Sequence, residues 1–463
     1  MHIFIHRRDL RMDDNTTLNQ MSKTLNEQII PIFIFTPEQI KREKNPYFSN
    51  NLVQFMCNSL KNLNNEYKKK GGCLSLFEGD IIYVLKNIKT YYNIKSVGFN
   101  RDYSPYSIER DIKIMEWCKL ENIKLFLKED MLLVDIDSHK QLNSNYKPYK
   151  VFTPFMRYEK SKCSKPRSID KYIPKISSFA LIKSRYYIPI NSIDKFYTKN
   201  KNALVREIKY ASKILSVLNT QKEYAMKRNF LTYKTSQLSA YINLGIVSIR
   251  QVYYKIIEVL GIDSPIITEL YWRDFYYNIL FFYPHITQQS FRPEYDNIAW
   301  NDPGKEFELW KEGKTGFPIV DACMRQLNKT GYMHNRGRMI VASFLTKDLL
   351  INWREGERYF ANKLIDYNIS ANNGGWQWAA GSGTDAQPYF RIFNPWTQMK
   401  DYDPDCNYVK EWIPELRDIP AKEIHKWYEY NLKYPNIKYP APILDHNAAY
   451  KKALIVFKKG LNK

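Results

Sequence analysis

The chain has 463 residues, which at ordinary domain sizes suggests about two to four domains. Its 70 Lys and Arg residues outnumber its 48 Asp and Glu residues, and the resulting net charge of +22 is typical of proteins with nucleic-acid or anionic-membrane partners. Aromatic residues make up 15% of the chain, a fraction that excludes an intrinsically disordered protein.

Residues 1–130 alternate between two patterns. Short apolar runs stand at 2–5, 29–35, 74–77, 96–99 and 123–127, and stretches with helical periodicity, such as 51–69 and 108–120, lie between them. Strands that alternate with helices predict a parallel sheet covered on both faces. We therefore expect a Rossmann-like α/β domain over residues 1–130, doubly wound around five parallel strands. Neither GxGxxG nor GxxxxGK[ST] occurs in it, which excludes a dinucleotide fingerprint and a P-loop.

Residues 131–205 are predicted to form a long basic connector between two domains. Between residues 157 and 206, 13 Lys and Arg residues accompany only three acids, Glu159, Asp170 and Asp194, and no clean hydrophobic period survives. This pattern is typical of a segment that lies on the surface rather than in a core. A solvated loop and a loop close to a polyanion both fit the charge.

Residues 206–463 are predicted to form an all-helical domain. Ser248 is expected to cap a helix that ends before Gly261, and the dipeptide Ser264-Pro265 is expected to open another. Gly331 is expected to close the next helix, and a further helix is expected to start at residue 335.

The spacing of cysteines and histidines excludes several kinds of site. The six cysteines are scattered without a CxxC pair, and the seven histidines are dispersed without HExxH, so we expect neither a disulfide framework nor a metal site. No uncharged stretch is apolar enough to span a membrane, and the charged first dozen residues do not resemble a secretory signal. The sequence predicts an intracellular protein in a reducing compartment, with no membrane partner.

Three local patterns could carry chemistry. Four glycines gather beside two tryptophans, which permits either a tight turn before a core tryptophan or close approach of a flat cofactor. The hydroxyl-rich stretch that begins at Thr235 is expected at a helix start, where it would suit phosphate, although an ordinary capping box looks similar. Glu269, Trp272 and Arg273 share one helical face, which by itself is most often solvated surface. The glycines are Gly374, Gly375, Gly381 and Gly383, and the tryptophans are Trp376 and Trp378.

Six segments in chain order carry a resemblance to a known family. They are HRRDLRMDDN, TSQLSAYINLG, ELYWRDFYYNI, EGKTGFPIVDACMRQLNKTGYMHNRGRM, NWREGERYFANKLID and SANNGGWQWAAGSGTDAQPYFRIFNP. With these segments the chain resembles the DNA photolyase/cryptochrome family, and most the class I cyclobutane pyrimidine dimer photolyases. The resemblance implies a C-terminal helical domain, residues 206–463, that holds FAD. It also implies an antenna-type N-terminal domain, for which a folate, a deazaflavin or no second chromophore all stay open.

The activity that the resemblance implies is light-driven repair of UV-damaged DNA. Light excites the fully reduced anionic flavin, which donates an electron to a pyrimidine dimer that is flipped out of the duplex, and the cyclobutane ring opens. The net charge agrees with a partner made of phosphates, and an enzyme that acts on a base must take it out of the stack. The protein is expected to be a monomer without an obligate protein partner.

The resemblance also implies a set of flavin contacts, residue by residue. Asn372 is expected to face flavin N5, where an amide adds no charge beside an anionic ring. Arg338 and Asp366 are expected to pair across the ring, so that the arginine opposes its negative charge. The matched cofactor positions are Tyr224, Thr235, Ser236, Gln237, Leu238, Ser239, Arg338, Asp366 and Asn372.

Substrate and electron-transfer positions follow from the same resemblance. Glu269 matches the carboxylate that hydrogen-bonds the dimer and stabilises its radical anion, and Trp272 and Trp378 match aromatic walls, where stacking is worth ~1–3 kcal/mol per base. Arginines that contact DNA phosphates or the pocket are matched by Arg228, Arg336 and Arg391. The relay that carries an electron from the surface to an oxidised flavin is matched by Trp376, Trp353 and Trp300. Core packing is the alternative explanation for each tryptophan.

Two positions indicate the substrate class. The related six-four photolyases carry histidines at the positions of Asn335 and Met339, because their lesion needs a proton moved. Here an amide and a thioether stand there, and neither is a general acid. His334 is adjacent but is expected to point off that face. The sequence therefore favours the cyclobutane dimer.

Several residues depart from the family pattern. Asn368 replaces a frequent second acid, and His6 replaces an aromatic residue. Gly337 replaces a leucine within a helix, where glycine lowers stability by ~1 kcal/mol relative to alanine. Arg101 stands where a folate-binding glutamate is expected. Other hypotheses are a cryptochrome-type blue-light photoreceptor, a photolyase specific for single strands, a flavin reductase, and a DNA-binding module without cofactor.

Overall fold

The computed structural model describes residues 1–138, 147–162, 166–177, 182–204 and 211–462. The chain forms two compact units, whose limits do not follow the sequence in single blocks. Unit 1 comprises Met1–Asn200, Val205–Thr220 and Leu238–Pro284, and unit 2 comprises Lys201–Leu204, Gln221–Gln237 and His285–Lys463. The domain limits expected at residues 130 and 205 stay predictions, since compact units and sequence domains are different divisions of a chain.

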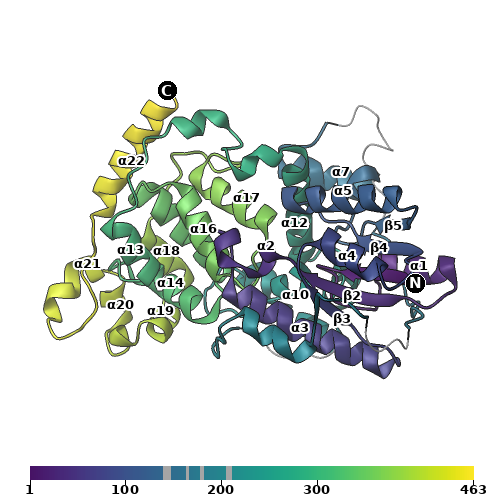
Figure 1. Ribbon diagram of the computed structural model, residues 1–463. Helices are drawn as coiled ribbons and strands as arrows, with labels where there is room; N and C mark the ends of the chain where they lie inside the picture. The colour runs from purple at the N-terminus through teal and green to yellow at the C-terminus, as the bar shows by residue number, and fades with distance from the viewer. Residues whose placement is uncertain (139–146, 163–165, 178–181, 205–210, 463) are drawn as a thin grey trace. The chain divides into compact units, whose positions relative to one another are not determined.

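A six-stranded sheet forms the centre of unit 1 (Figure 1). Its strand order is β5-β4-β1-β2-β3-β6, and neighbouring strands are parallel except β3 and β6. The five strands that the apolar runs predict are all present, so the predicted α/β class is confirmed. The strands are β1 (His2–His6), β2 (Ile30–Phe35), β3 (Ser75–Glu78), β4 (Ser96–Asn100), β5 (Lys124–Lys128) and β6 (Tyr187–Ile188).

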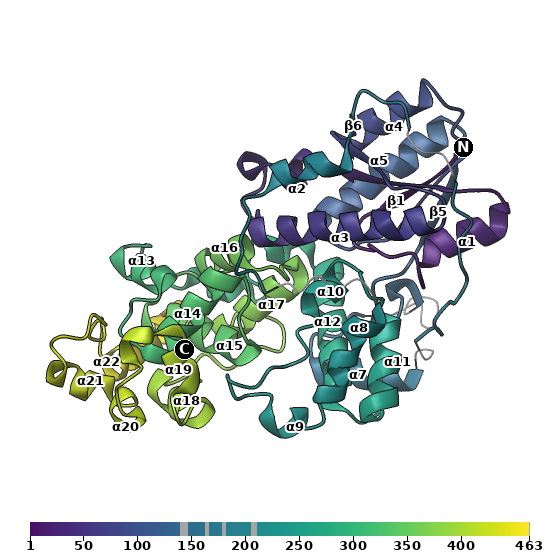
Figure 2. The same cartoon turned by 90° about the horizontal axis from the view of Figure 1, so that it is seen from below.

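Helices cover both faces of the sheet. Figure 2 shows α4 and α5 on one side of the strands and α1 and α3 on the other, which is the doubly wound arrangement. Local signals start these helices: Ser49 accepts a hydrogen bond from the backbone of Leu52 in α3, and Ser104 precedes Pro105 at the start of α5. The helices are α1 (Thr16–Leu25), α2 (Pro37–Ile40), α3 (Asn50–Lys69), α4 (Ile81–Lys89) and α5 (Pro105–Leu120).

The basic connector is not only a surface segment, and that part of the prediction is wrong. Its strand β6 extends the sheet by antiparallel pairing with β3, and Ile182 and Ile193 are buried. Its helix α7 (Phe152–Lys162) packs against α12 (Pro265–Phe282) through buried Phe152 and Phe155. Single apolar residues at irregular spacing anchor this segment, and a search for hydrophobic periods does not detect such anchors.

Three later helices also belong to unit 1, and a buried ion cluster ties one of them, α11, to the segments that follow β1 and β5. Arg250 on α11 donates to Asp14 at 2.8 Å and to Asp130 at 2.8 Å. Helix α11 starts at the predicted cap, where Ser248 accepts from the backbone of Gln251. The helices are α10 (Ser239–Asn243), α11 (Ile249–Leu260) and α12; the short α8 (Ala211–Leu215) precedes them.

Unit 2 is helical, as the sequence predicts. The parallel bridge Asn301–Ile351 is the one β-type pairing among its described residues. Gly331 ends α14 in the left-handed conformation, as expected. Helix α15 passes directly into a π-helical turn, Phe344–Asp348. The helices are α9 (Tyr224–Lys227), α13 (Lys305–Glu312), α14 (Pro318–Thr330), α15 (Asn335–Ser343), α16 (Trp353–Lys363), α17 (Ile369–Ala380), α18 (Pro395–Tyr402), α19 (Asn407–Trp412), α20 (Ala421–Ile424), α21 (Trp427–Tyr430) and α22 (His446–Gly460). In the described part of the chain, no helix is long and apolar enough to cross a membrane.

Candidate functional site

Helix α17 has a bare face in the middle of its length. Gly374 and Gly375 are helical, so the reading of these two glycines as a tight turn is wrong. A Cβ atom added at Gly375 would meet no heavy atom within 4 Å, whereas Gly374 is buried. Asn372, about one turn earlier, is half-buried and donates its Nδ2 to the backbone oxygen of Glu357 at 3.0 Å. This leaves the carbonyl oxygen of Asn372 as a hydrogen-bond acceptor beside open space.

The departure at Asn368 has a structural explanation. Its side-chain oxygen accepts from the backbone N–H of Ala371 at 3.2 Å and from the hydroxyl of Ser370 at 2.6 Å. Asn368 is therefore the N-cap of α17, a position for which asparagine is among the best residues. The asparagine that replaces the acid thus caps the helix that carries Asn372.

Arg338 and Asp366 form a direct ion pair in unit 2. One guanidinium nitrogen, Nη2, donates to both oxygens of Asp366, at 2.8 and 3.1 Å, and Nε donates to the backbone oxygen of Met333 at 2.9 Å. Burial alone would lower the pKa of Arg338, but Asp366 and Tyr332 raise it above its ordinary value. The guanidinium is thus a fixed positive charge, suited to oppose an anionic ring.

The stretch expected to bind diphosphate runs through a loop into a helix start. Helix α10 begins at Ser239, as expected for that hydroxyl, but Thr235 and Ser236 lie in the preceding loop, so the expected helix-dipole contribution does not apply to them. Gln237 adopts a left-handed conformation with φ of 53°. Within the described residues, the backbone N–H groups of Thr235, Ser236 and Gln237 donate no hydrogen bond. Successive N–H groups around a left-handed residue can form an anion-binding concavity, so the residues fit a phosphate for a different reason.

The three relay tryptophans occupy connected positions in unit 2. A Cβ added at Gly356 would lie 2.2 Å from the ring of Trp376, so this indole packs directly on α16, one turn after Trp353. The segment that carries Trp300 joins the start of α16 through the bridge of Asn301, whose N–H donates to Leu350 at 2.7 Å. Trp376 and Trp353 are buried, and Trp300 is partly exposed. Trp376 and Trp353 are thus both inside the protein, and Trp300 is the one of the three that reaches the surface.

Helix α15 brings the substrate-class residues together. The amide nitrogen of Asn335 lies 3.8 Å from the sulfur of Met339, so the two share a face. His334 is the buried N-cap of this helix, and its Nδ1 accepts from the backbone of Arg336 at 3.1 Å. Burial, assisted by Arg338 and Arg336, lowers the pKa of His334 to about 4, so it is neutral at pH 7. Asn335 and Met339 form this face of α15, and neither side chain is an acid.

Gly337 is required by packing. A Cβ at this position would come 2.8 Å from Sγ of Cys323 and 3.1 Å from Cγ of Met333. A leucine therefore does not fit among these neighbours, and their side chains occupy its volume. His6 is also accommodated, because its Nε2 bonds the hydroxyl of Tyr67 at 2.6 Å and its Nδ1 the backbone oxygen of Asp9 at 3.0 Å.

The predicted lesion contacts Glu269 and Trp272 lie one turn apart on α12, in unit 1, and both are half-buried. Arg273 does not belong with them as a substrate contact, because its Nη1 donates to the backbone oxygen of Met131 at 2.7 Å and to Asp274 at 3.0 Å. The ring of Phe152 stacks on Trp272. Leu238 and Ser239 also lie in unit 1, and the remaining predicted site residues lie in unit 2.

The three predicted DNA arginines differ in how firmly they are held. Arg336 donates to the side chain of Asn229 at 2.8 Å and stacks over Tyr402. Arg228 lies over the ring of Tyr224, and Arg391 is exposed beyond α17. Trp378, the second predicted wall, is half-buried on α17.

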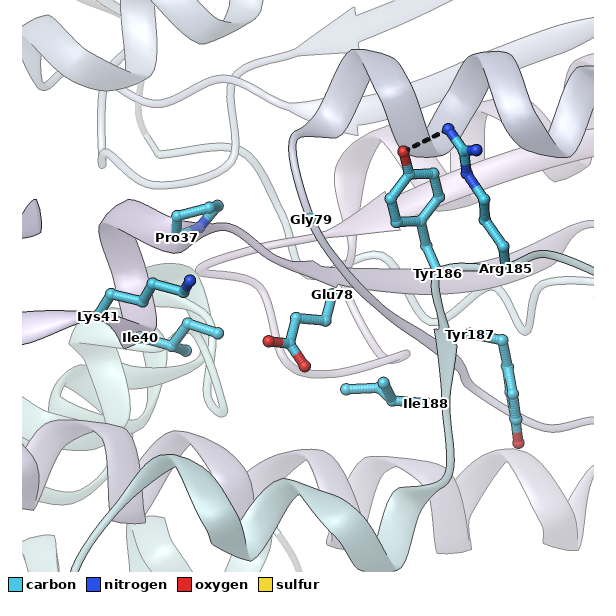
Figure 3. A pocket seen from close by; sticks show the side chains of 9 residues that line it. All are labelled: Pro37, Ile40, Lys41, Glu78, Gly79, Arg185, Tyr186, Tyr187 and Ile188. Carbon is cyan, nitrogen blue, oxygen red and sulfur yellow. Dashed lines mark hydrogen bonds between the residues drawn. The ribbon is translucent and has the colours of Figure 1, made fainter.

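The sheet offers two hollows at the carboxyl ends of its strands, where α/β folds bind ligands. The larger has a volume of about 240 Å³ and is bordered by α2, the end of β3 and the connector before β6. Figure 3 shows Lys41 on one side of it and Arg185, hydrogen-bonded to Tyr186, on the other. The second, at the ends of β1 and β4, has a volume of only about 10 Å³, and Arg7, which lines it, is paired with Asp111 at 2.6 Å.

Arg101, at the position expected to carry a folate-binding glutamate, forms an ion pair with Asp137. The positive charge of Arg101 is therefore neutralised by a carboxylate of the protein itself. In the described residues, no group of three or more His, Cys, Asp or Glu side chains could hold a metal ion.

Sequence reasoning missed three residues around the predicted sites. Phe152 lies in the connector, where no period marks it. Trp310 is buried with its ring 6.2 Å from that of Trp376, and Gly356 receives the edge of Trp376. The scarcity of glycine could have drawn attention to Gly356, since a lone glycine inside a helix often marks a close approach.

Two family models and curated relatives match this chain. Residues 2–172 match the family model described as DNA photolyase, and residues 266–459 match the model described as the FAD binding domain of DNA photolyase. The chain is 34% identical to the deoxyribodipyrimidine photo-lyase of Escherichia coli, over 98% of both chains.

Solved structures of similar fold include both repair enzymes and a cryptochrome. An archaeal photolyase from Sulfolobus tokodaii, crystallised with two FAD molecules that imply a novel light-harvesting cofactor, has a TM-score of 0.86 and 36% identity over 99% of each chain. A class III photolyase from Agrobacterium tumefaciens has a TM-score of 0.89 and 32% identity over 100% of this chain and 98% of its own. The cryptochrome of Synechocystis has a TM-score of 0.86 and 26% identity over 98% of this chain and 99% of its own.

Proposed function

The chain belongs to the DNA photolyase family, and we propose that it repairs cyclobutane pyrimidine dimers in DNA by light-driven electron donation from bound FAD. The observation that carries the proposal is the bare face of α17, where Asn372 presents an acceptor oxygen beside the open space at Gly375. Gly375 contributes no side chain at that point, so a flat ring can approach the helix backbone there. The buried Trp376 follows Gly375 on the same helix and packs its ring on Gly356 of α16.

Residues of this chain supply the groups that such a cofactor needs. We propose that Thr235, Ser236 and Gln237 hold the diphosphate through their unused backbone N–H groups, with Leu238, Ser239 and Tyr224 as neighbours. The Arg338–Asp366 pair would place positive charge near the ring, and Asn372 would accept a hydrogen bond from it. When bound in its reduced form, FAD would supply the excitable electron donor.

The proposed substrate is the cyclobutane dimer because its repair requires no proton donor. Ring opening needs one electron, which is later returned, whereas a six-four lesion needs acid–base help. Asn335 and Met339 offer none, and the depressed pKa of His334 keeps its ring neutral. We propose that Asn335 and Met339 contact the lesion as a polar and an apolar neighbour.

The lesion contacts on the other helices are proposals of the same kind. Glu269 would accept a hydrogen bond from a pyrimidine N–H and stabilise the dimer's radical anion. Trp272 on α12 and Trp378 on α17 would each stack on a base, worth ~1–3 kcal/mol per base. Their half-buried rings have accessible surface for such a contact.

We propose that Trp376, Trp353 and Trp300 return an electron to the flavin after it has been oxidised. The support is the direct packing of Trp376 on α16, the helix that begins with the buried Trp353, and the partial exposure of Trp300. An indole is readily oxidised, and the partly exposed Trp300 can release a proton to water.

DNA is the proposed partner, with phosphate contacts from Arg228, Arg336 and Arg391. The net charge of +22 supports a phosphate-rich partner. Arg336 is held by Asn229 and Tyr402, and this fixed geometry favours a specific contact. The protein is proposed to act as a monomer inside the cell; assignment to class I, rather than to the class III type of the Agrobacterium relative, is also a proposal.

A blue-light photoreceptor is the second candidate, favoured by the likeness to the Synechocystis cryptochrome. A single-strand-specific photolyase is a third variant. A second, light-harvesting chromophore in unit 1 is proposed by analogy with the Sulfolobus structure. The larger hollow, at about 240 Å³, lies below the ~300 Å³ of ordinary ligand pockets, so binding would need its side chains to move.

The experiment that tests the proposal compares lesions and strands. Pre-reduced protein is illuminated with oligonucleotides that carry one cyclobutane dimer or one six-four lesion, each as a single strand and as a duplex. We expect repair of the cyclobutane dimer in duplex DNA and none of the six-four lesion. Repair of single strands alone would indicate the third variant, and no repair of any substrate would favour the photoreceptor.

A further inference from the structure

The ring of Phe152 covers one face of the Trp272 indole. The two ring centroids are 3.7 Å apart and the planes differ by 7°, which is a parallel stack at contact distance. Tyr276 approaches the same indole at 5.7 Å and 31°. Of the two faces of Trp272, one is therefore already occupied by a side chain of the protein.

Phe152 is itself held rigidly. It is 5% exposed at the start of α7, and its ring meets Phe275 edge-on at 5.8 Å. Phe155, one turn later on α7, is 1% exposed and packs on Phe275 at 5.4 Å. Phe275 in turn meets Trp272 edge-on at 5.6 Å. This cluster anchors Phe152, so its ring is a fixed support rather than a mobile cover.

We propose that Phe152 is a positioning residue for the lesion: it sets the plane of Trp272 and leaves one indole face for a flipped-out base. This inference rests on the proposed function, because it assumes that Trp272 stacks on the substrate. The bound base would then be the third ring in a stack of Phe152, Trp272 and pyrimidine. The connector thereby contributes to lesion recognition without touching the lesion.

The physical reason is preorganisation. A half-buried indole without its support can rotate about its side-chain bonds, and binding a base must then restrict that rotation. An aromatic pair is worth about 0.5–1.5 kcal/mol beyond burial, so loss of the stack at Phe152 corresponds to about a two- to tenfold weaker hold on the base. Undamaged DNA, whose bases stay in the duplex stack, does not use Trp272 and should not respond.

The test measures dissociation constants of the full-length protein with bound FAD, in the dark. Two duplexes of the same sequence serve as ligands, one with a single cyclobutane thymine dimer and one undamaged. We compare the natural protein with Phe152→Leu, which fills the volume without a flat ring, with Phe152→Tyr, which keeps the ring, and with Trp272→Ala. Phe155→Leu is the matched control, because it makes the same substitution in the same cluster and on the same helix, at a ring without a ring contact to Trp272.

We expect Phe152→Leu to weaken binding of the dimer duplex about two- to tenfold, with unchanged binding of undamaged duplex. Phe152→Tyr should bind the dimer duplex as tightly as the natural protein, and Phe155→Leu should leave both dissociation constants unchanged. In the double variant Phe152→Leu with Trp272→Ala, the Phe152 change should add nothing to the loss from Trp272→Ala, because Phe152 acts through Trp272.

The failures of the two ideas are distinguishable. If Trp272→Ala does not weaken dimer binding, the proposed role of Trp272 is wrong, and with it this inference. If Trp272→Ala weakens binding but Phe152→Leu does not, only the positioning role is overturned. The positioning role is also overturned if Phe152→Leu weakens dimer binding equally in the natural protein and in Trp272→Ala. It is overturned as well if Phe152→Leu weakens binding of undamaged and dimer-containing duplexes equally, because Phe152 would then have only a structural role.

Discussion

Arg338 donates through a single nitrogen, Nη2, to both carboxylate oxygens of Asp366, at 2.8 and 3.1 Å. The Asp366 side chain is 2% exposed and that of Arg338 is 29% exposed, so removing the carboxylate leaves a partly buried guanidinium without its counter-charge. We expect Asp366→Ala to lower the free energy of unfolding by about 1–3 kcal/mol. Denaturant titration of the FAD-free protein measures this.

The same variant should also lose its response to FAD. Bound ligand stabilises the folded state in proportion to its affinity, so added FAD should raise the melting temperature of the natural protein and hardly that of Asp366→Ala. The double variant Arg338→Met with Asp366→Leu is the control, because it removes both charges. It should be more stable than Asp366→Ala, and its melting temperature should still not rise when FAD is added. A normal rise in the melting temperature of either variant would show that the Arg338–Asp366 pair does not contribute to FAD binding.

Gly375→Ala separates helix stability from cofactor binding. The added methyl meets no atom within 4 Å, so alanine should stabilise α17 by about 0.5–1 kcal/mol in the absence of FAD. If the ring lies on this face, the same methyl should reduce the FAD retained after purification. Absorbance of the purified protein and denaturation of the FAD-free form measure the two effects.

Gly356→Ala is the matched control for this pair of effects. Its methyl would lie 2.2 Å from the ring of Trp376, so it should destabilise the protein with or without FAD. Full FAD content in a stabilised Gly375→Ala variant would contradict the proposed position of the ring.

Trp376→Phe should block photoreduction of the oxidised flavin and leave repair by pre-reduced protein largely intact. The indole is proposed as an electron donor, and a phenyl ring keeps most of its packing on Gly356 but is much harder to oxidise. Trp310→Phe is the control, since Trp310 is also buried and its ring centroid lies 6.2 Å from that of Trp376. Illumination of the oxidised protein, followed by absorbance, distinguishes the two. Loss of repair in pre-reduced Trp376→Phe would remove this residue from the relay.

His334 should make stability depend on pH in a defined window. Burial lowers the pKa of His334 to about 4, below the value of ~6.5 expected when unfolded. A lowered histidine pKa leaves the free energy of unfolding unchanged above about pH 6.5. It reduces that free energy as the pH falls from about 6.5 towards 4, because only the unfolded chain takes up the proton. The full difference approaches about 3 kcal/mol.

The variant that tests this window is His334→Asn, which still caps α15 but does not titrate. The stability difference between His334→Asn and the natural protein should shift in favour of the variant between pH 6.5 and 4 and stay constant from pH 7 to 8. A constant difference in the free energy of unfolding across the whole pH range would show that the pKa of His334 is not lowered in the folded protein.

The sequence predicted most of the fold because its signals were local. Apolar runs identified the five parallel strands, and Ser248, Ser264 and Gly331 marked helix ends where the structure has them. The connector was misjudged because Ile182, Ile193 and the phenylalanines of α7 are buried through contacts with distant segments. Such contacts leave no period in the sequence.

Prediction of the site had the same limit. Family motifs identified Asn335 and Met339, which do share a face, and Arg338 and Asp366, which do pair. Motifs did not reveal that Thr235 precedes the helix rather than starting it, because a hydroxyl-rich stretch looks alike in both settings. Nor could they show that Phe152 supports Trp272, since stacking between two segments depends on tertiary packing.

The measurement that tests the account most directly is the light-dependent recovery of thymines from a duplex with one cyclobutane dimer, incubated with pre-reduced protein. We predict full recovery under near-ultraviolet light, no recovery in the dark, and no recovery with protein from which FAD has been removed. Retention of the dimer under illumination by protein that contains reduced FAD would contradict the proposed activity.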